Sequence, residues 1–158
     1  MTTAPTMRRE LAALCISAFA LLLAPAMAPA QQAEDIGNYR VHYNALNTNA
    51  LPPEVAGAYG IQRSGSRAML NIAVLRKAES TDSMDTPTHA EISARAINLT
   101  GQRREIELQE LEDDEAVYYI GTFRIHDEET LTFTISVQPE GSQQPPQEFS
   151  FQQQFFTE

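Results

Sequence analysis

Apolar and polar residues alternate with a period of two along most of the chain. The segment 131–137 (LTFTISV) shows this most clearly, because every second residue is large and apolar and the residues between are Thr or Ser. Such alternation is typical of a β-strand that buries one face. The same pattern recurs in segments 39–45, 70–74, 90–96, 105–109, 117–125 and 149–155. The sequence therefore predicts about seven strands.

Short polar connections separate these segments. They carry turn residues such as Thr100-Gly101-Gln102 and Pro139-Glu140-Gly141. Most are short enough to join antiparallel neighbours. We therefore predict an all-β fold, an antiparallel two-sheet sandwich of the immunoglobulin-like kind, with a small barrel as the alternative. The Cys and Trp residues that mark antibody domains are absent after residue 30.

Three segments depart from the regular alternation. At Ile97 and Leu99 the apolar residues change parity, which predicts a bulge or a change of sheet. Segment 52–60 (PPEVAGAYG) begins with proline and an acid and ends with glycine, which predicts one short helix near residues 52–59. Segment 80–88 (STDSMDTPT) is polar and aperiodic, which predicts a mobile loop.

The first thirty residues have the layout of a secretory signal peptide. Arg8 and Arg9 precede an uncharged apolar run over 11–23, and Ala28-Pro29-Ala30 fits a small-residue cleavage site. The apolar run is shorter than the roughly 20 residues that span a bilayer. We predict a cleaved signal over 1–30, a flexible mature N-terminus over 31–36 and a single sandwich domain over 37–158, soluble after cleavage.

The composition of the chain disfavours some kinds of partner and excludes some kinds of site. Cleavage after Ala30 leaves 128 residues with nine basic and twenty acidic side chains, a net charge of −11. Such a surface repels nucleic acid and anionic lipid, so neither is an expected partner. The only cysteine, Cys15, lies in the signal, which excludes a disulfide or a thiolate site in the mature chain.

No motif for a known chemistry stands out. The sequence holds no G-x-S-x-G, H-E-x-x-H, P-loop or G-x-G-x-x-G pattern. We therefore assign no catalytic residue, metal or cofactor and expect a protein that is not an enzyme. The histidines His42, His89 and His126 have no local ligand spacing. The acidic runs 112–115 and 127–129 flank one strand, which would hold them roughly 30 Å apart, too far to share an ion.

Residues 39–64 (YRVHYNALNTNALPPEVAGAYGIQRS) resemble a bacterial family of exported proteins, the domain of unknown function 4426. The resemblance rests on the HYN that ends a strand, the PEVA-x-x-YG helical turn and the R-S that follows. Weaker similarities include Leu70-Asn71-Ile72, Tyr118-Tyr119 and the C-terminal 151–156 (FQQQFF). The resemblance implies a Gram-negative source and a periplasmic location, and it implies no activity.

The interruption of the β pattern around the predicted helix is the best candidate for a binding site. Irregular loops on a rigid sandwich often carry binding groups, and Tyr and Arg are favoured at interfaces. The candidate binding residues are Tyr43, Asn44, Asn47, Tyr59, Arg63 and Ser64. Each also has a structural interpretation, since Tyr can pack a helix, Asn can hold a turn and Arg can pair with an acid.

The C-terminal segment 148–158 (EFSFQQQFFTE) predicts a strand whose edge could meet a partner by strand addition. Together these features favour a non-catalytic binding or assembly module whose partner is another periplasmic or envelope protein, with the oligomeric state left open. One alternative is a small periplasmic hydrolase with a site around Tyr43, Asn44 and Arg63. A second is a metal-binding accessory protein that uses His42 and His126.

Overall fold

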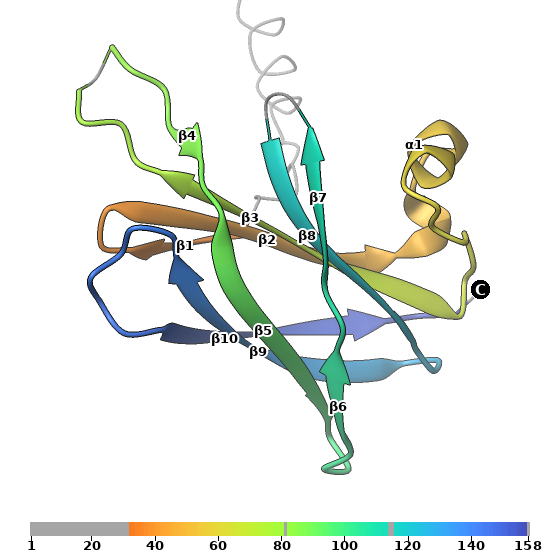
Figure 1. The fold of residues 1–158 in the computed structure, drawn as a ribbon. Coiled ribbons are helices and arrows are strands. Elements are labelled where there is room, and N and C mark those ends of the chain that lie inside the picture. Colours follow the sequence, from red (N-terminus) through yellow and green to blue (C-terminus); the bar gives the residue numbers. More distant parts are fainter. Residues whose placement is uncertain (1–31, 81, 114–115, 158) are drawn as a thin grey trace, which may run out of the picture. The chain divides into compact units, whose positions relative to one another are not determined.

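Two antiparallel β-sheets face each other in the computed structural model, which describes residues 32–80, 82–113 and 116–157 (Figure 1). Sheet A contains β1 (Gln32–Ile36), β2 (Tyr39–Asn47), β3 (Arg67–Arg76), β4 (Thr86–Pro87), β7 (Gln109–Asp113) and β8 (Ala116–Arg124). Sheet B contains β5 (Ala90–Asn98), β6 (Arg103–Ile106), β9 (Glu129–Pro139) and β10 (Gln147–Phe155). Two short helical turns, η1 (Thr48–Ala50) and α1 (Pro53–Ala58), follow β2.

The strand order in sheet A is β1-β2-β3-β8-β7, with β4 paired to the end of β3, and in sheet B it is β10-β9-β5-β6. This arrangement confirms the antiparallel two-sheet sandwich, and α1 confirms the short helix expected near residues 52–59. Pro53 fits the first helical position because its missing N–H would be unpaired there. All described residues belong to one compact unit, Gln31–Glu158. The expected signal peptide over 1–30 lies outside the described residues.

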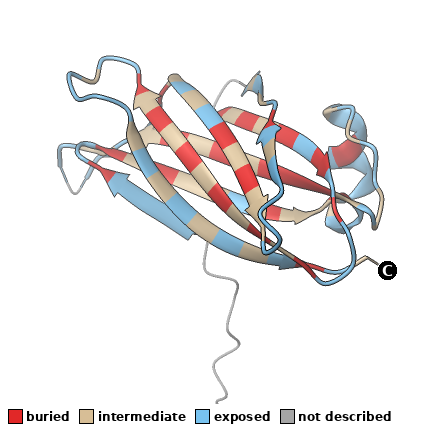
Figure 2. Ribbon diagram, turned by 90° about the horizontal axis from the view of Figure 1, so that it is seen from below, coloured by how far each residue is buried: buried red, intermediate tan, exposed pale blue. Residues whose placement is uncertain are grey.

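The core fills the space between the sheets. Figure 2 shows that buried residues alternate with less buried ones along the strands. Phe133 of β9 lies at its centre and is fully buried. Its ring stacks on Phe151 with centroids 4.8 Å apart and meets Phe123 and Phe155 at 5.7 Å and 6.3 Å. Edge and offset contacts of this kind add to the free energy gained by burying aromatic area.

The number of strands differs from the expected seven because two short strands carry little periodic signal and one expected strand is divided in two. Residues 31–36 were expected to be flexible, but Gln32–Ile36 forms β1, paired in register with β2 from Gln32↔Tyr43 to Ile36↔Tyr39. Four of its five residues are exposed, so the segment lacks the alternation of a half-buried strand. Within the expected loop 80–88, Thr86–Pro87 pairs with Arg76 and Leu75 as β4.

The expected single strand over 105–109 is divided between the two sheets. β6 ends at Ile106 in sheet B and β7 begins at Gln109 in sheet A, so the chain crosses through Glu107 and Leu108. Gly121 of β8 makes room for the crossing. A Cβ atom at Gly121 would lie 2.5 Å from Ile106 Cγ2 and 2.7 Å from the Glu107 carbonyl oxygen. Because the alternation of apolar and polar residues continues through this segment, the pattern does not indicate the change of sheet.

The parity change at Ile97 marks neither a bulge nor a change of sheet. β5 stays in continuous register with β9 through Ile97↔Thr132 and Asn98↔Leu131. The turn that follows leaves Leu99 80% exposed. The switch therefore reflects the end of the buried pattern, where apolar residues no longer need to face the core.

Candidate functional site

The outer faces of the two sheets differ in chemistry. On sheet B the outward residues of β9 are Thr, Ser and Gln, and they meet polar residues of β10. Ser150 Oγ donates to Thr134 Oγ1 at 3.2 Å, and Gln152 Nε2 donates to Thr132 Oγ1 at 3.0 Å. This face is the expected solvated face of a sandwich, because its polar side chains hydrogen-bond one another and remain open to water.

The outer face of sheet A is much more apolar. Its register places five side chains in one row across the sheet: Ala33, His42, Ala73, Tyr118 and Leu111. The row faces away from the core, since the alternating residues of β2 on the other side are buried. Figure 1 shows that α1 and β4 stand on this side of sheet A, away from sheet B. They border the face at its two ends.

Two hollows lie on this face. The first encloses about 450 Å³ and is lined by residues of β2, β3, β8 and the β4 region, including His42, Asn71 and Tyr118. The second encloses about 530 Å³ between the segment after α1 and the strands β7 and β8, and it includes Leu111 and Ile120. The hollows are neighbours, because Leu111 pairs with Tyr118 and Ile120 pairs with Asn71. Clefts with an apolar floor and a few polar groups are typical of ligand sites.

Two buried polar atoms in the first hollow have no hydrogen-bond partner among the residues that the structure describes. They are Nδ1 of His42 and Oδ1 of Asn71. An unpaired buried polar atom costs about 1–3 kcal/mol. Both atoms are covered by the protein, so a ligand reaches them only if the two side chains turn toward the hollow. Hydrogen bonds from the ligand to Asn71 Oδ1 and with His42 would then recover part of that cost. These two atoms are the most distinctive polar groups of the face.

The charges at the β1 end of this face neutralise one another. The Arg40 guanidinium lies 3.0 Å from Asp35 and 3.3 Å from Asp85, and Lys77 lies 3.0 Å from Asp35. The hydrogen bonds from Arg40 and then Lys77 lower the pKa of Asp35, so it stays ionised. Asp85 also accepts a hydrogen bond from the Ala78 N–H at 3.0 Å. The hollow therefore borders a balanced ion cluster rather than a region of one charge.

The six candidate binding residues divide between the core, the loops and this face. Tyr43 points between the sheets, where its ring lies 4.8 Å from Phe149 and 4.7 Å from Phe151. Burial, followed by the charge of Glu34, raises the pKa of Tyr43. Asn44 is exposed and lines the first hollow, while Tyr59 lines the second.

The other three candidates hold the loop around η1. Asn47 Nδ2 donates to the carbonyls of Phe156 at 2.7 Å and Gly65 at 3.2 Å. Arg63 Nη2 donates to the Asn49 carbonyl at 2.8 Å. The Ser64 N–H donates to the buried Thr48 hydroxyl at 2.9 Å. The structure thus places Asn44 and Tyr59 on one face and uses Asn47, Arg63 and Ser64 as loop contacts.

Sequence reasoning missed Asn71, Tyr118 and Leu111 as parts of a candidate site. They lie on β3, β8 and β7, far apart in sequence, and become neighbours only through strand pairing. Their spacing within each strand gave no signal, because it is the ordinary outward half of an alternating pattern. His42, one of the two histidines of the metal-binding alternative, also belongs to this face.

The three histidines lie in separate surroundings. His89 Nδ1 is 3.3 Å from Glu110, and His126 Nδ1 is 3.4 Å from Glu129. His42 lies in the same row across sheet A as Tyr118, because both pair with Ala73. His126 comes eight residues after Tyr118, which places it about 25 Å from that row along the strand direction. Within the described residues, no group of three or more His, Cys, Asp and Glu side chains could hold a metal ion. The structure does not bring His42 and His126 together.

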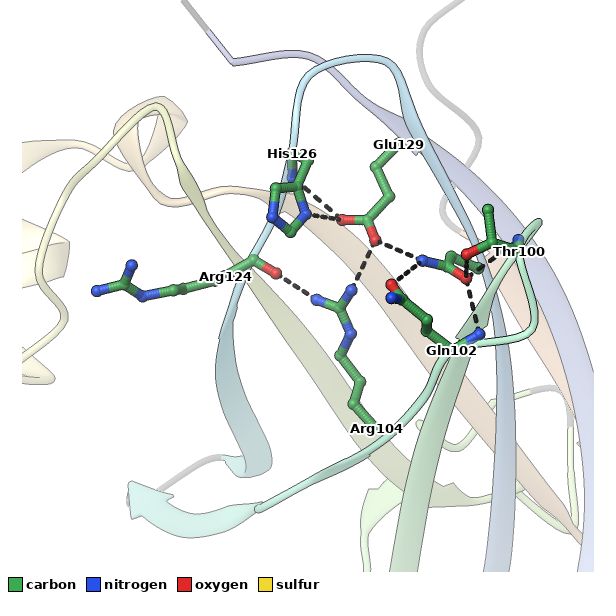
Figure 3. Close-up of polar contacts among 7 residues, drawn as sticks. Thr100, Gln102, Arg104, Arg124, His126 and Glu129 are labelled. Carbon is green, nitrogen blue, oxygen red and sulfur yellow. Dashed lines mark hydrogen bonds and ion pairs between the residues drawn. The ribbon is translucent and has the colours of Figure 1, made fainter.

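A second polar cluster surrounds the buried carboxylate of Glu129, at the start of β9 (Figure 3). Its Oε1 lies 2.6 Å from Arg104 Nη2 and accepts from Asn98 Nδ2 at 3.4 Å. Its Oε2 accepts from the His126 N–H at 3.1 Å. Burial alone would raise the pKa of Glu129, but these donors and the Arg104 charge together lower it. Arg104 also donates to the Arg124 carbonyl, so the cluster joins β6 of sheet B to the end of β8 in sheet A.

The fold and this face define a class: a two-sheet antiparallel sandwich with an open hollow on one outer face. Residues 33–158 match the model of the DUF4426 family, a domain of unknown function, and the chain belongs to that family. A DUF4426 family protein from Pseudomonas aeruginosa PAO1 is 33% identical, with a TM-score of 0.66 over 80% of this chain and 95% of that one. No functionally curated protein matches the chain.

Two less similar structures share the fold. FetP of uropathogenic Escherichia coli strain F11, expressed recombinantly in the periplasm, is 11% identical with a TM-score of 0.58, over 79% of this chain and 93% of that one. A copper-bound variant of Campylobacter jejuni P19 is 12% identical with a TM-score of 0.51, over 78% of this chain and 94% of that one. At these identities the similarity shows the fold alone. Across the described ranges, no helix is both long and apolar enough to cross a membrane.

Proposed function

We propose that this protein is an exported, non-catalytic binding module whose ligand or partner docks on the outer face of sheet A. The observation that carries the proposal is the pair of unpartnered polar atoms, His42 Nδ1 and Asn71 Oδ1, on side chains that line the first hollow. The ligand that fits is uncharged over the area of contact. It offers an apolar surface to Tyr118 and Leu75 and hydrogen-bonding groups to His42 and Asn71.

The other polar clusters support this choice because each is satisfied internally. Glu129 has a partner on both carboxylate oxygens. His89 contacts Glu110, and Arg63 contacts a backbone carbonyl. A hydrolase site around Tyr43, Asn44 and Arg63 has no support, since Tyr43 packs between the sheets while Arg63 holds a loop.

The periplasm is the proposed location. The signal-like first thirty residues support export, and so does the fold shared with FetP, which was recovered after expression in the periplasm. The partner is then another periplasmic or envelope protein, or a small molecule of that compartment.

Copper is the second candidate ligand, because proteins of similar fold hold it. The donor set around His42 does not fit a copper site well. His42 is the one imidazole in the first hollow, and its paired neighbours across the sheet, Ala33 and Ala73, carry no donor atoms. Copper sites in proteins need several converging nitrogen or sulfur ligands.

The test is site-specific photocrosslinking in the native periplasm, followed by mass spectrometry. A photoreactive residue replaces Asn44 on the outer face of sheet A, and the matched control replaces the exposed Ser93 on the outer face of sheet B. We expect one dominant adduct from position 44, reduced at least tenfold by Asn71→Leu, and none from position 93. Equal labelling at both positions, or none at position 44, would contradict the proposal.

A copper titration of the purified mature chain tests copper as the second candidate ligand. We expect the same weak binding isotherm for the wild type and for His42→Ala. Tight copper binding that disappears in His42→Ala would favour the metal-binding function over the proposed one.

A further inference from the structure

The four strands that end the strand orders of the two sheets differ in how they protect their free side. β1, β6 and β7 have four or five residues each, and each carries two or three charged side chains. β10 has nine residues and a single charge, Glu148. Short or charged edges discourage pairing with another chain, whereas long neutral edges permit it.

β10 also lacks three other devices that block an edge. It holds no proline or lysine, and its register with β9 runs without a bulge from Gln147↔Val137 to Phe155↔Glu129. Within the described part of the chain it pairs with β9 alone. Its second row of backbone N–H and C=O groups is therefore available to a further strand.

The inner side of β10 carries half-buried aromatic rings. Phe149 and Phe151 pack against Tyr43 at the side of the core, but neither is fully covered. An added strand with aromatic side chains at matching positions would cover more of these two rings and extend the core.

We propose that the occupant of this edge is a second copy of the same strand, paired antiparallel about a two-fold axis at Ser150. In this register Phe149 lies opposite Phe151 of the second copy, and Glu148 lies opposite the second copy's Gln152. The axis places Ser150 opposite Ser150. Pairing covers residues 147–153 and stops there because Pro146, which would come next, has no N–H.

β10 complements itself in this register, which favours a second copy over an unrelated partner. The chain after residue 30 has a net charge of −11, so two copies repel one another over most of their surfaces. β10 carries a single charge, so the repulsion is weak where the two strands would meet. In this register no like charges face each other across the added pair, since Glu148 meets an amide. The polar row Glu148, Ser150, Gln152 would continue the hydroxyl and amide contacts that β10 already makes with Thr134 and Thr132. The outer face of sheet A stays free in such a dimer.

The experiment measures the oligomeric state of the mature chain by sedimentation at increasing concentration. We expect a concentration-dependent dimer for the wild type. Ser150→Lys places two lysines opposite each other at the axis and should weaken the dimer at least about tenfold. Ser93→Lys makes the same exchange at an exposed position on the internal strand β5 and should leave the dimer unchanged.

A cysteine crosslink tests the register. The mature chain holds no cysteine, so Ser150→Cys introduces the only one. Directly opposed residues of an antiparallel pair have Cα atoms about 4.5–5.5 Å apart, within disulfide range. We expect Ser150→Cys to form a covalent dimer on mild oxidation and Ser93→Cys to form none. A wild type that stays monomeric at high micromolar concentration, or a dimer unaffected by Ser150→Lys and not crosslinked by Ser150→Cys, overturns the proposal.

Discussion

Glu129 is the carboxylate whose surroundings are most fully specified. It is 9% exposed, and its contacts join the β5–β6 and β8–β9 connections. A buried carboxylate is tolerated only when donors replace the water it has lost. Asn98, Arg104 and the His126 N–H supply those donors. The residue therefore acts as a structural clamp between the two sheets at this end of the sandwich.

Replacing Glu129 by Gln should destabilise the fold by about 2 kcal/mol at neutral pH, because the charge-assisted hydrogen bonds are lost. The folded-state pKa of Glu129 lies below its ordinary value of 4.5. Its contribution is thus complete above that value and fades as the pH falls through the folded-state pKa. Urea unfolding of both proteins should show a difference that is full at pH 7 and shrinks below about pH 4.5.

Glu128→Gln is the matched control, because Glu128 is the exposed neighbour of the clamp. It should change the free energy of unfolding by less than about 0.5 kcal/mol. Equal effects of the two exchanges, or a Glu129→Gln effect that stays constant down to low pH, would show that the clamp contributes no specific stabilisation.

At the scale of elements, the passage of the chain from sheet B to sheet A between β6 and β7 determines how the two sheets are connected on this side. It closes one side of the sandwich and brings β7 beside β8, which completes the row that ends in Leu111. The passage is possible because Gly121 has no side chain where Ile106 and Glu107 approach.

Gly121→Ala should therefore destabilise the fold by about 1–3 kcal/mol, the usual cost of overpacking. The Ala Cβ would lie 2.7 Å from a backbone oxygen, which a side-chain rotation cannot relieve. Gly57→Ala in α1 is the matched control. A Cβ at Gly57 would meet nothing within 4 Å, so this exchange should be neutral or stabilise by roughly 0.5–1 kcal/mol.

Thermal unfolding of both variants measures the contrast. If the Gly121→Ala protein is as stable as the wild type, the segment at Ile106 and Glu107 shifts away from the new methyl group with little loss of folding free energy. The outer face of sheet A would then also be adjustable around Leu111.

Most elements could be predicted from alternation alone, since β2, β3, β5, β8, β9 and β10 each bury one face against the other sheet. β1 and β4 could not, because exposed edge strands need no apolar row. The division of 105–109 between two sheets could not be predicted from alternation either. Its two halves continue one alternating pattern, although they face the same core from opposite sheets. The rows across sheet A depend on strand order, which alternation does not encode.

For the whole molecule, export is the feature to test. The signal-like segment is predicted to end at Ala30, and the chain after it has no cysteine and so folds without a disulfide. We expect the protein to be recovered from the periplasmic fraction of a Gram-negative host with an N-terminus at Gln31, measured by intact mass. Retention of residues 1–30 in the recovered protein would contradict cleavage at this site.

The sequence by itself determined the antiparallel sandwich, the short helix after β2, the acidic cysteine-free composition and the resemblance to DUF4426. Those properties follow from local periodicity, turn chemistry and charge, which are present in the chain before it folds. Only the tertiary structure decided which outward residues share a face. His42, Asn71, Tyr118 and Leu111 come from four strands and meet through register, which is set by long-range pairing. The same pairing left β10 unprotected at its edge, since an edge is a property of strand order.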